Sequence, residues 1–475
     1  MNSQHLFKSF FQSVILKQLP WIGLIAGLIG LVLPSLINPE GLSPEGVRAL
    51  GIFLMAAIFW MTEPVPIYAT SLLVILLQVF LLSDVGLFKM ETSPVLPKYR
   101  EFYAALANPI IILFLGGFSL ASAAVKFGLD RNLTRLLLKP FGHKPANIIL
   151  GLMLATALLS AFMSNTATTA MMMTVILPVV AVMDPKDPFR KALALSVPFA
   201  ANLGGVATPI GTPPNAIALA ALNQMGLRIS FTTWMILAVP IVAVMLFVGW
   251  RILLILFPPA SDRLILNLEG RFSRTPLALI TYFVFGLTVL LWVTEKLHGI
   301  PASVVAFIPV AMLPALSVLD KKEIRNFPWE VLWLVAGGIS IGASIKETGL
   351  ADWMLTRIPL NSLGTTGAIL AFGVLGYLVA NLVSNTVTAS ILVPLVVGFS
   401  LTGNLGSSEI VQGVILVGVI VSFSMMLPIS TPPNAIAMSS GLIQTGDMAK
   451  AGLLIGLVGI ILVILCAFFY WPMIL

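Results

Sequence analysis

Ser164-Asn165-Thr166-Ala167-Thr168 returns almost unchanged as Ser384-Asn385-Thr386-Val387-Thr388, 220 positions later in the chain. Each copy stands in an apolar run without any Asp, Glu, Lys or Arg, residues 145–183 for the first and 358–408 for the second. Neighbouring hydroxyl and amide side chains offer hydrogen-bond donors and acceptors, and these groups are costly in hydrocarbon unless something satisfies them. Two such clusters at matched positions predict two half-sites that face one ligand.

The composition around these clusters is that of a membrane protein. Of the 475 residues 58% are hydrophobic and 9% charged, whereas a soluble domain carries about 25% charged residues. A helix needs about 20 apolar residues to span a bilayer, which leaves room for about a dozen spans or re-entrant pieces. The net charge of +7 is attributed to loop orientation, so the expected partner is the lipid bilayer and no nucleic acid. One cysteine and three scattered histidines predict no disulfide framework and no transition-metal site.

The apolar segments predict an all-α polytopic chain. In the first half they cover residues 21–37, 47–61, 66–82, 109–125, 146–183, 192–223 and 231–257. In the second half they cover residues 276–293, 301–319, 329–345, 360–401, 410–442 and 452–472. A polar loop is expected at 83–108, a basic stretch at 126–144 and a charged linker between the halves at 258–275.

Two further motifs are duplicated and indicate an internal repeat. Gly116-Gly117-Phe118-Ser119 matches Gly337-Gly338-Ile339-Ser340 at an offset of 221. Thr212-Pro213-Pro214-Asn215 matches Thr431-Pro432-Pro433-Asn434 at an offset of 219. Packing glycines or a helix kink could explain any one of these motifs, but not their shared register. The two halves are therefore interpreted as products of a duplication.

The direction of the repeat follows from the number of membrane crossings. If both Ser-Asn-Thr segments are hairpins that enter and leave on one side, each half crosses five times and the second half is inverted. With the N-terminus cytoplasmic and the C-terminus outside, 18 of the 26 Lys and Arg residues lie on the inner side, as the positive-inside rule requires. Single spans would lose most of this bias. The prediction is about 11 transmembrane helices plus two re-entrant hairpins in an inverted-topology repeat.

The Thr-Pro-Pro-Asn segments predict broken helices. Two prolines remove two backbone donors and clash with the preceding turn, so a helix cannot continue through them. Broken helices in a bilayer occur where protein or an aqueous cavity covers them. Their freed carbonyl oxygens suit sodium and their N-terminal amides suit an anion.

The paired Ser-Asn-Thr hairpins, the paired Thr-Pro-Pro-Asn breaks and Leu115-Gly116-Gly117-Phe118 together resemble the divalent anion/sodium symporter (DASS) family of di- and tricarboxylate carriers. The resemblance covers essentially the whole chain. It implies a homodimeric elevator carrier that moves a transport domain against a scaffold domain. On this basis residues 1–143 and 258–358 are assigned to the scaffold, and residues 144–257 and 359–475 to the transport domain.

The resemblance also implies the site residues. The substrate carboxylates would meet Ser164, Asn165, Thr166, Thr212, Pro213, Ser384, Asn385, Thr386, Thr431 and Pro432. A first sodium site would use Ser160, Ser164, Asn165 and the backbone near Gly211, and a second would use Val383, Asn385 and Ser430. The second site departs from the family pattern, because Ala380 stands where a hydroxyl is expected. The loss of an oxygen ligand should weaken this site, although Asn381 or water could compensate.

The function implied is secondary active transport of C4 and C5 dicarboxylates such as succinate, malate, fumarate and 2-oxoglutarate. Sodium as the coupling ion favours symport, whereas Ala380 favours sodium-independent exchange, and both remain open. A carrier of citrate, sulfate or another oxyanion is the alternative on the same fold. An enzyme is not expected, because neither central segment contains a histidine or an acid to activate a nucleophile. The short region before the first apolar segment favours a bacterial inner membrane.

Overall fold

The computed structural model describes residues 3–87, 97–264, 272–357, 364–402 and 405–475. Every regular element in these ranges is a helix, and many of the helices are apolar. At this level the predicted fold class, an all-α chain with the helices of a polytopic membrane protein, is confirmed. The exact number of spans, the re-entrant hairpins and the elevator motion stay predictions.

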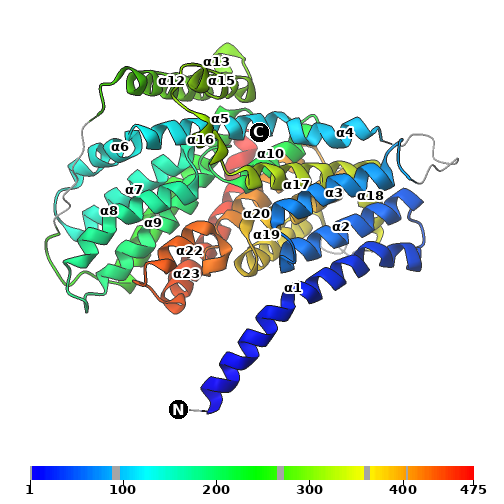
Figure 1. The fold of residues 1–475 in the computed structure, drawn as a ribbon, viewed down its shortest axis with the longest axis horizontal. Coiled ribbons are helices and arrows are strands. Elements are labelled where there is room, and N and C mark those ends of the chain that lie inside the picture. The colour runs from blue at the N-terminus through cyan, green and yellow to red at the C-terminus, as the bar shows by residue number, and fades with distance from the viewer. Residues whose placement is uncertain (1–2, 88–96, 265–271, 358–363, 403–404) are drawn as a thin grey trace. The chain divides into compact units, whose positions relative to one another are not determined.

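The helices of the first half follow the predicted apolar segments (Figure 1). They are α1 Ser3–Ile37, α2 Pro44–Thr62, α3 Ile67–Leu82, α4 Tyr99–Ala104, α5 Pro109–Lys126, α6 Leu129–Leu138, α7 Pro145–Phe162, α8 Asn165–Ala181, α9 Phe189–Val206, α10 Pro213–Gln224 and α11 Phe231–Leu256. Two helices lie outside the predicted apolar segments: α4 in the expected polar loop, 83–108, and α6 in the basic stretch, 126–144. α1 begins at Ser3 and continues through the apolar segment expected at 21–37.

The helices of the second half are α12 Pro276–Val293, α13 Glu295–His298, α14 Ala302–Val305, α15 Phe307–Ala315, α16 Lys321–Arg325, α17 Trp329–Glu347, α18 Leu350–Arg357, α19 Gly364–Leu382, α20 Asn385–Thr402, α21 Ser407–Ser422, α22 Pro432–Ser439 and α23 Thr445–Leu465. From α17 onward they repeat the order of α5 to α11. The series α5 to α11 and the series α17 to α23 match element for element. The duplication inferred from three motifs therefore extends over the secondary structure, while the inversion of the second half stays a prediction.

Local chemistry explains where several helices begin. Ser43, Ser230 and Thr275 are N-caps whose side chains accept a hydrogen bond from the backbone three residues later. Proline occupies the first turn of α2, α7, α10, α12 and α22, where its missing N–H has no intrahelical partner to lose. These signals are local in sequence, which is why the segment boundaries could be read from it.

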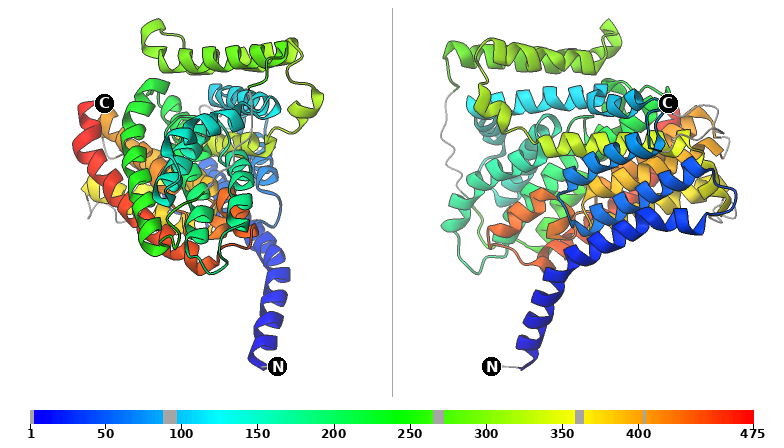
Figure 2. Two further views of the ribbon diagram at one scale, coloured as in Figure 1. Left: turned by 90° about the vertical axis from the view of Figure 1, so that its left-hand side faces the viewer. Right: turned by 45° about the vertical axis from the view of Figure 1, so that its right-hand side comes forward.

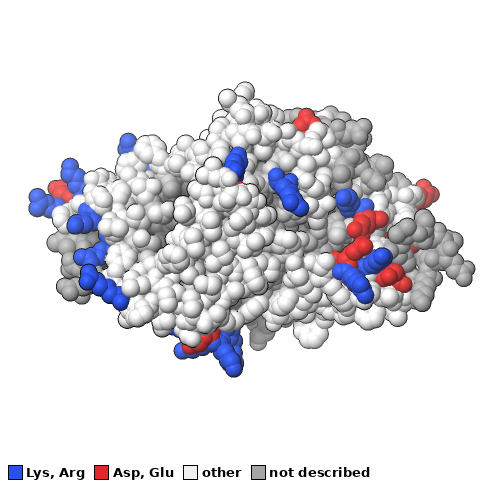
Figure 3. All heavy atoms as spheres, turned by 90° about the horizontal axis from the view of Figure 1, so that it is seen from above, with Lys and Arg blue, Asp and Glu red and all other residues white. Residues whose placement is uncertain are grey.

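Many of the long helices have the length, composition and exposure of membrane spans. Seven helical stretches among the described residues are long and apolar enough to cross a bilayer. In two of them, α11 and α12, only 33% and 28% of the most apolar window is buried within the protein. On the face drawn in Figure 3 most surface atoms belong to uncharged residues, and the charged side chains form separate groups. Exposed apolar side chains of this extent are suited to contact with lipid.

The chain divides into two compact units, described here one at a time. The first comprises residues 1–108, 329–368 and 390–405. Within it α2 and α17 pack on α3, and α1 lies along α2, as the blue helices of Figure 2 show. Gly337 lets α17 approach α3, because a Cβ there would lie 2.5 Å from the Cβ of Ser71. Gln78 of α3 donates to the carbonyl oxygen of Ser340 and to Ser344 Oγ, both at 3.0 Å, so the buried polar groups at this crossing are paired.

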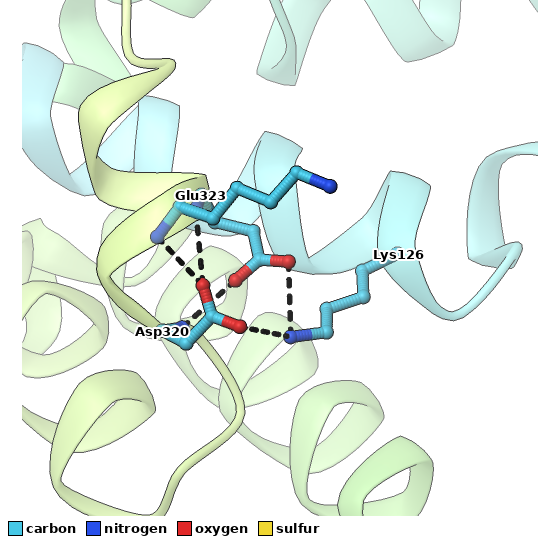
Figure 4. A network of polar contacts seen from close by, with 4 residues as sticks. Lys126, Asp320 and Glu323 are labelled. Atoms are coloured by element: carbon cyan, nitrogen blue, oxygen red, sulfur yellow. Dashed lines mark hydrogen bonds and ion pairs between the residues drawn. The ribbon is translucent and has the colours of Figure 1, made fainter.

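The second unit comprises residues 109–328, 369–389 and 406–475, and it contains both Ser-Asn-Thr and both Thr-Pro-Pro-Asn motifs. Gly116 of α5 repeats the role of Gly337, since a Cβ there would lie 2.6 Å from the carbonyl oxygen of Ala306. At the end of α5, Lys126 Nζ lies 3.0 Å from Glu323 Oε1 and 3.9 Å from Asp320 Oδ2 (Figure 4). Asp320 and Glu323 form the capping box of α16, so this ion pair joins α16 to α5. The assignment of scaffold and transport domains stays a prediction.

Candidate functional site

The first Ser-Asn-Thr segment is a break between two helices. α7 ends at Phe162, Met163 and Ser164 are non-helical, and α8 begins at Asn165. Ser164 has the extended backbone of an N-cap, with φ −61° and ψ 130°, and its carbonyl oxygen accepts from Thr168 N at 2.9 Å. The first backbone N–H groups of α8 therefore have no partner within the helix and carry the positive end of its dipole. Such an N-terminus suits an anion.

The second Ser-Asn-Thr segment is built in the same way. α19 ends at Leu382, and α20 begins at Asn385 after two non-helical residues. The Ser384 carbonyl oxygen accepts from Thr388 N at 3.0 Å, and Ser384 Oγ accepts from Val387 N at 3.2 Å. Both segments thus present a Ser cap and an Asn as the first helical residue. We call residues 164–166 the first tip and residues 384–386 the second tip.

The polar side chains of the tips are only partly covered. Ser164 and Asn165 are half-buried and Thr166 is exposed. Ser384 and Thr386 are half-buried as well, whereas Asn385 is buried. At both tips, except at the buried Asn385, these side chains can therefore be reached by a ligand without unfolding either helix.

Oxygen atoms converge on the Asn165 amide of the first tip. Its orientation follows from hydrogen bonding: with the nitrogen placed toward α7 and α9, Nδ2 lies 2.5 Å from Ser160 Oγ and 3.0 Å from the Gly211 carbonyl oxygen. The Ala201 carbonyl oxygen is 3.3 Å from Nδ2 and accepts from Ser160 Oγ at 2.8 Å. Gly205 leaves the space for this amide, because a Cβ there would lie 2.6 Å from its nearest atom. The structure therefore brings together Ser160, Asn165 and Gly211 of the first predicted sodium site.

The equivalent position behind the second tip is different. Ala380, which is fully buried, has no hydroxyl, and Asn385 Oδ1 is buried without a hydrogen-bond partner in the described part of the chain. Ser430 Oγ instead donates to the Asn381 carbonyl oxygen at 3.2 Å.

The Asn381 side chain makes two hydrogen bonds to the backbone. Its Nδ2 donates to the Tyr377 carbonyl oxygen at 2.8 Å, and its Oδ1 accepts from Met426 N at 3.0 Å. This side chain fastens α19 to the non-helical segment after α21. Compensation for the missing hydroxyl by Asn381 or by water stays a prediction.

The first Thr-Pro-Pro-Asn motif follows an interrupted helix, as predicted. α9 ends at Val206 and α10 begins at Pro213, with Thr212 extended at φ −147° and ψ 145°. Asn215 Nδ2 reaches back to the carbonyl oxygens of Thr208 at 2.8 Å and Gly205 at 3.0 Å. The asparagine of the motif therefore satisfies carbonyls that the interruption leaves without helical partners.

The second Thr-Pro-Pro-Asn motif has the same construction. α21 ends at Ser422, α22 begins at Pro432, and Thr431 is extended at φ −147° and ψ 147°. Asn434 Nδ2 donates to the carbonyl oxygens of Met425 at 3.1 Å and Leu427 at 3.0 Å. In both halves the asparagine of the motif therefore stabilises the non-helical segment by hydrogen bonds to its carbonyl oxygens. The sequence analysis identified the motif but did not predict this role.

One residue joins the halves within the second unit. Asn202 Nδ2 of α9 donates to Thr431 Oγ1 and to Asn434 Oδ1, both at 3.1 Å, and all three side chains are buried. α22 packs against both α8 and α9, which places the second Thr-Pro-Pro-Asn motif beside the helix of the first tip. Asn202 was not predicted. The signal for it was an amide side chain in an apolar segment, two residues before Gly204-Gly205.

The polar groups gathered here are hydroxyls, amides and carbonyl oxygens. In the described ranges no three His, Cys, Asp or Glu side chains lie close enough to hold a metal ion. Oxygen donors of this kind suit hard cations such as sodium. Thr212, Pro213, Thr431 and Pro432 lie at the starts of α10 and α22, and their contact with a substrate stays a prediction, as does the meeting of the two tips.

Comparison with known proteins agrees with this construction. The family model described as "Sodium:sulfate symporter transmembrane region" matches residues 17–475. The sodium-dependent dicarboxylate transporter SdcS of Staphylococcus saprophyticus is 31% identical over 96% of this chain and 92% of its own length. SdcS of Staphylococcus aureus strain NCTC 8325 is 30% identical over the same shares.

A solved structure has the same fold. The crystal structure of the Alcanivorax borkumensis YdaH transporter superposes with a TM-score of 0.52 at 13% identity, over 85% of this chain and 98% of that one. Its likeness concerns the fold alone. The family match over nearly the whole length, together with the doubled motifs, decides the classification. The chain belongs to the sodium:sulfate symporter family of membrane transporters, the divalent anion/sodium symporter group that its motifs indicate.

Proposed function

We propose that this protein carries C4 and C5 dicarboxylates across the cell membrane by secondary active transport coupled to sodium. The observation that carries the proposal is the set of oxygens from Ser160, Ala201 and Gly211 that converges on Asn165, directly beside a helix N-terminus that suits an anion. The relatives named sodium-dependent dicarboxylate transporters support both parts. The protein is a transporter and not an enzyme.

The two tips would hold the two carboxylates. The helix N-termini of α8 and α20 each contribute about half a positive charge, and the tips themselves contain neither Lys nor Arg. A dianion moved through a region of low dielectric needs more compensation than this. Sodium bound beside the first tip would supply it. Substrate and cation would then cross together more readily than either alone.

The proposed setting is that of an elevator carrier. A homodimer in the bacterial inner membrane, with the N-terminus cytoplasmic and the C-terminus outside, would move the tips between the two sides. The matched series α5 to α11 and α17 to α23 supports a mechanism that exchanges the roles of the two halves. A carrier of sulfate, citrate or another oxyanion remains the alternative, because the matching family model is named for sulfate. Competition of unlabelled sulfate and citrate against labelled succinate would identify such a carrier.

Uptake into proteoliposomes tests the coupling. With an inward sodium gradient, the initial rate of labelled succinate uptake is expected to exceed the rate in choline by about tenfold or more, the effect of about 1.4 kcal/mol of coupling. Substitution of choline for sodium on both sides is the control. Equal rates in the two cations, with stimulation by succinate preloaded inside, would assign sodium-independent exchange instead.

The missing hydroxyl behind the second tip allows a gain-of-function test. We expect Ala380→Ser to lower the sodium concentration for half-maximal uptake about three- to tenfold, because one added hydrogen bond or ligand contributes about 1 kcal/mol. The new hydroxyl would stand five positions before Asn385, as Ser160 stands five positions before Asn165, and Asn385 Oδ1 has no partner in the described structure. Ser160→Ala removes the corresponding hydroxyl behind the first tip and should raise the sodium concentration for half-maximal uptake. An unchanged sodium dependence in both variants would contradict the assignment of these two positions.

A further inference from the structure

The Asn165 amide closes a group of oxygen atoms that could also coordinate a cation. Nδ2 lies 2.5 Å from Ser160 Oγ, 3.0 Å from the Gly211 carbonyl oxygen and 3.3 Å from the Ala201 carbonyl oxygen. The only hydrogen among these three oxygens belongs to the Ser160 hydroxyl, which donates to Ala201 at 2.8 Å. With Oδ1 turned toward them instead, the one Ser160 hydrogen would be shared between Oδ1 and the Ala201 carbonyl oxygen, and the Gly211 carbonyl oxygen would face Oδ1 without a donor. The amide hydrogens thus supply the positive partial charge that the ring lacks.

The same ring cannot accept this nitrogen and a sodium ion together. A cation among these oxygens would repel the amide hydrogens, and only the carbonyl end of the side chain can act as a ligand. For Asn165 to contribute a ligand, its amide must turn end for end about its terminal bond. The terminal torsion of asparagine is broad and roughly two-fold, so both orientations are sterically available to the side chain.

We infer that Asn165 is an internal substitute for the coupling cation: in the absence of sodium its amide nitrogen closes the oxygen ring, and sodium displaces it and turns its oxygen inward. The inference rests on the proposed function. Asn165 is the first residue of α8 and lies between Ser164 and Thr166. A change in its orientation therefore changes which group the first tip presents to the carboxylate.

The asparagine of the second tip is not surrounded by such a ring of oxygen atoms in the described structure. Asn385 Oδ1 is buried and has no hydrogen-bond partner in the described ranges, and Ala380 offers no hydroxyl. A Cβ at Gly205 would lie 2.6 Å from the Asn165 amide, so glycine leaves room for that side chain. The equivalent residue in the second half, 219 positions later, is Ser424, whose Oγ donates to the Tyr377 carbonyl oxygen. The two halves are therefore unequal. Only the first holds its asparagine by a ring of acceptors.

Asn165→Asp isolates the donor role, because a carboxylate cannot donate but a carboxylic acid can. In detergent and choline buffer at pH 9, its unfolding temperature should lie at least about 3 °C below that of the unchanged protein. The difference should shrink toward pH 5, where a protonated carboxyl donates to the ring. Asn165 is surrounded by α7, α9 and residues 207–212. The charged residues of these segments are Arg190 and Lys191, both in the first turn of α9, and Lys191 pairs with Asp447 at 3.0 Å. Asn165→Ala is the control: it also lacks the donor but has no group that titrates, so its difference from the unchanged protein should not shrink toward pH 5.

Sodium is the second arm of this experiment. At pH 9 it should raise the unfolding temperature of the Asn165→Asp variant more than that of the unchanged protein, since no internal donor competes there. If sodium raises the unfolding temperature of Asn165→Asp but acid does not reduce its difference from the unchanged protein, the inference is wrong and the proposed sodium coupling stands. Sodium without effect on either protein overturns the inference and the sodium coupling of the proposed function together.

A labelling measurement covers the case in which Asn165→Asp does not fold. In a Cys466→Ser background, Thr166→Cys places one thiol on the exposed position of the first tip. Sodium should change its rate of modification by a polar maleimide at least about twofold when Asn165 is present, and not in an Asn165→Ala background. The same sodium effect in both backgrounds overturns the inference.

Discussion

Succinate uptake into proteoliposomes is expected to fall to the level of empty vesicles when Ser164 and Asn385 are both replaced by alanine. Ser164 is the N-cap of α8 in the first tip, and Asn385 is the first residue of α20 in the second. Each would lose a hydrogen bond to a charged carboxylate, worth about 1.5–3 kcal/mol. Together the two losses correspond to a reduction of roughly 10²- to 10⁴-fold in uptake below saturation. Initial rates of labelled succinate uptake at a fixed sodium gradient measure it.

The control is a buried serine that bonds only within its own helix. Ser400 Oγ of α20 donates to the Val396 carbonyl oxygen at 2.7 Å, so Ser400→Ala should leave uptake within about twofold. Each single variant, Ser164→Ala or Asn385→Ala, should already abolish most uptake. Retention of more than a tenth of the rate in the double variant, with protein of normal unfolding temperature, would remove the tips from the binding site.

The sequence predicted well those features that depend on neighbouring residues. The segments expected at 276–293 and 329–345 correspond to α12 Pro276–Val293 and α17 Trp329–Glu347. The Pro-Pro pairs lie in the first turn of α10 and α22, where proline has no helical hydrogen bond to lose, so each pair marks a helix start after the interruption. Helix caps and proline positions are encoded within a few residues. For this reason they can be read without knowledge of the tertiary structure.

Features that depend on distant residues could not be read in this way. The oxygen ring around Asn165 includes the backbone carbonyl of Ala201, an atom that every residue possesses and no motif marks. Asn202 acquires its meaning only because Thr431 and Asn434 lie beside it, more than 200 positions later in the chain. The engagement of Asn381 by Met426 N likewise follows from packing. The segments that form the candidate site could therefore be predicted from the sequence, but the contacts between them could not.

Asn434→Ala is expected to lower the free energy of unfolding by roughly 3 kcal/mol, the combined effect of several buried groups left unpaired. The Met425 and Leu427 carbonyl oxygens lose their donor, and the Asn202 amide loses one of its acceptors. Asn434 is fully buried, so water does not readily replace these bonds. Denaturant unfolding in detergent, followed by tryptophan fluorescence, measures the loss. Uptake should fall with it, because the start of α22 would no longer be held beside α8.

Asn215→Ala is the matched variant in the first half, since it also removes an amide that pairs with carbonyls before a Thr-Pro-Pro motif. The two differ in one respect: Asn434 Oδ1 accepts from Asn202, whereas Asn215 Oδ1 has no partner in the described structure. A double-mutant cycle of Asn202→Ala and Asn434→Ala should therefore give a coupling energy of about 1 kcal/mol. The cycle of Asn202→Ala and Asn215→Ala should give a value within about 0.5 kcal/mol of zero. Equal coupling in both cycles would mean that Asn202 acts on the general packing of α9 and does not join the two halves through Asn434.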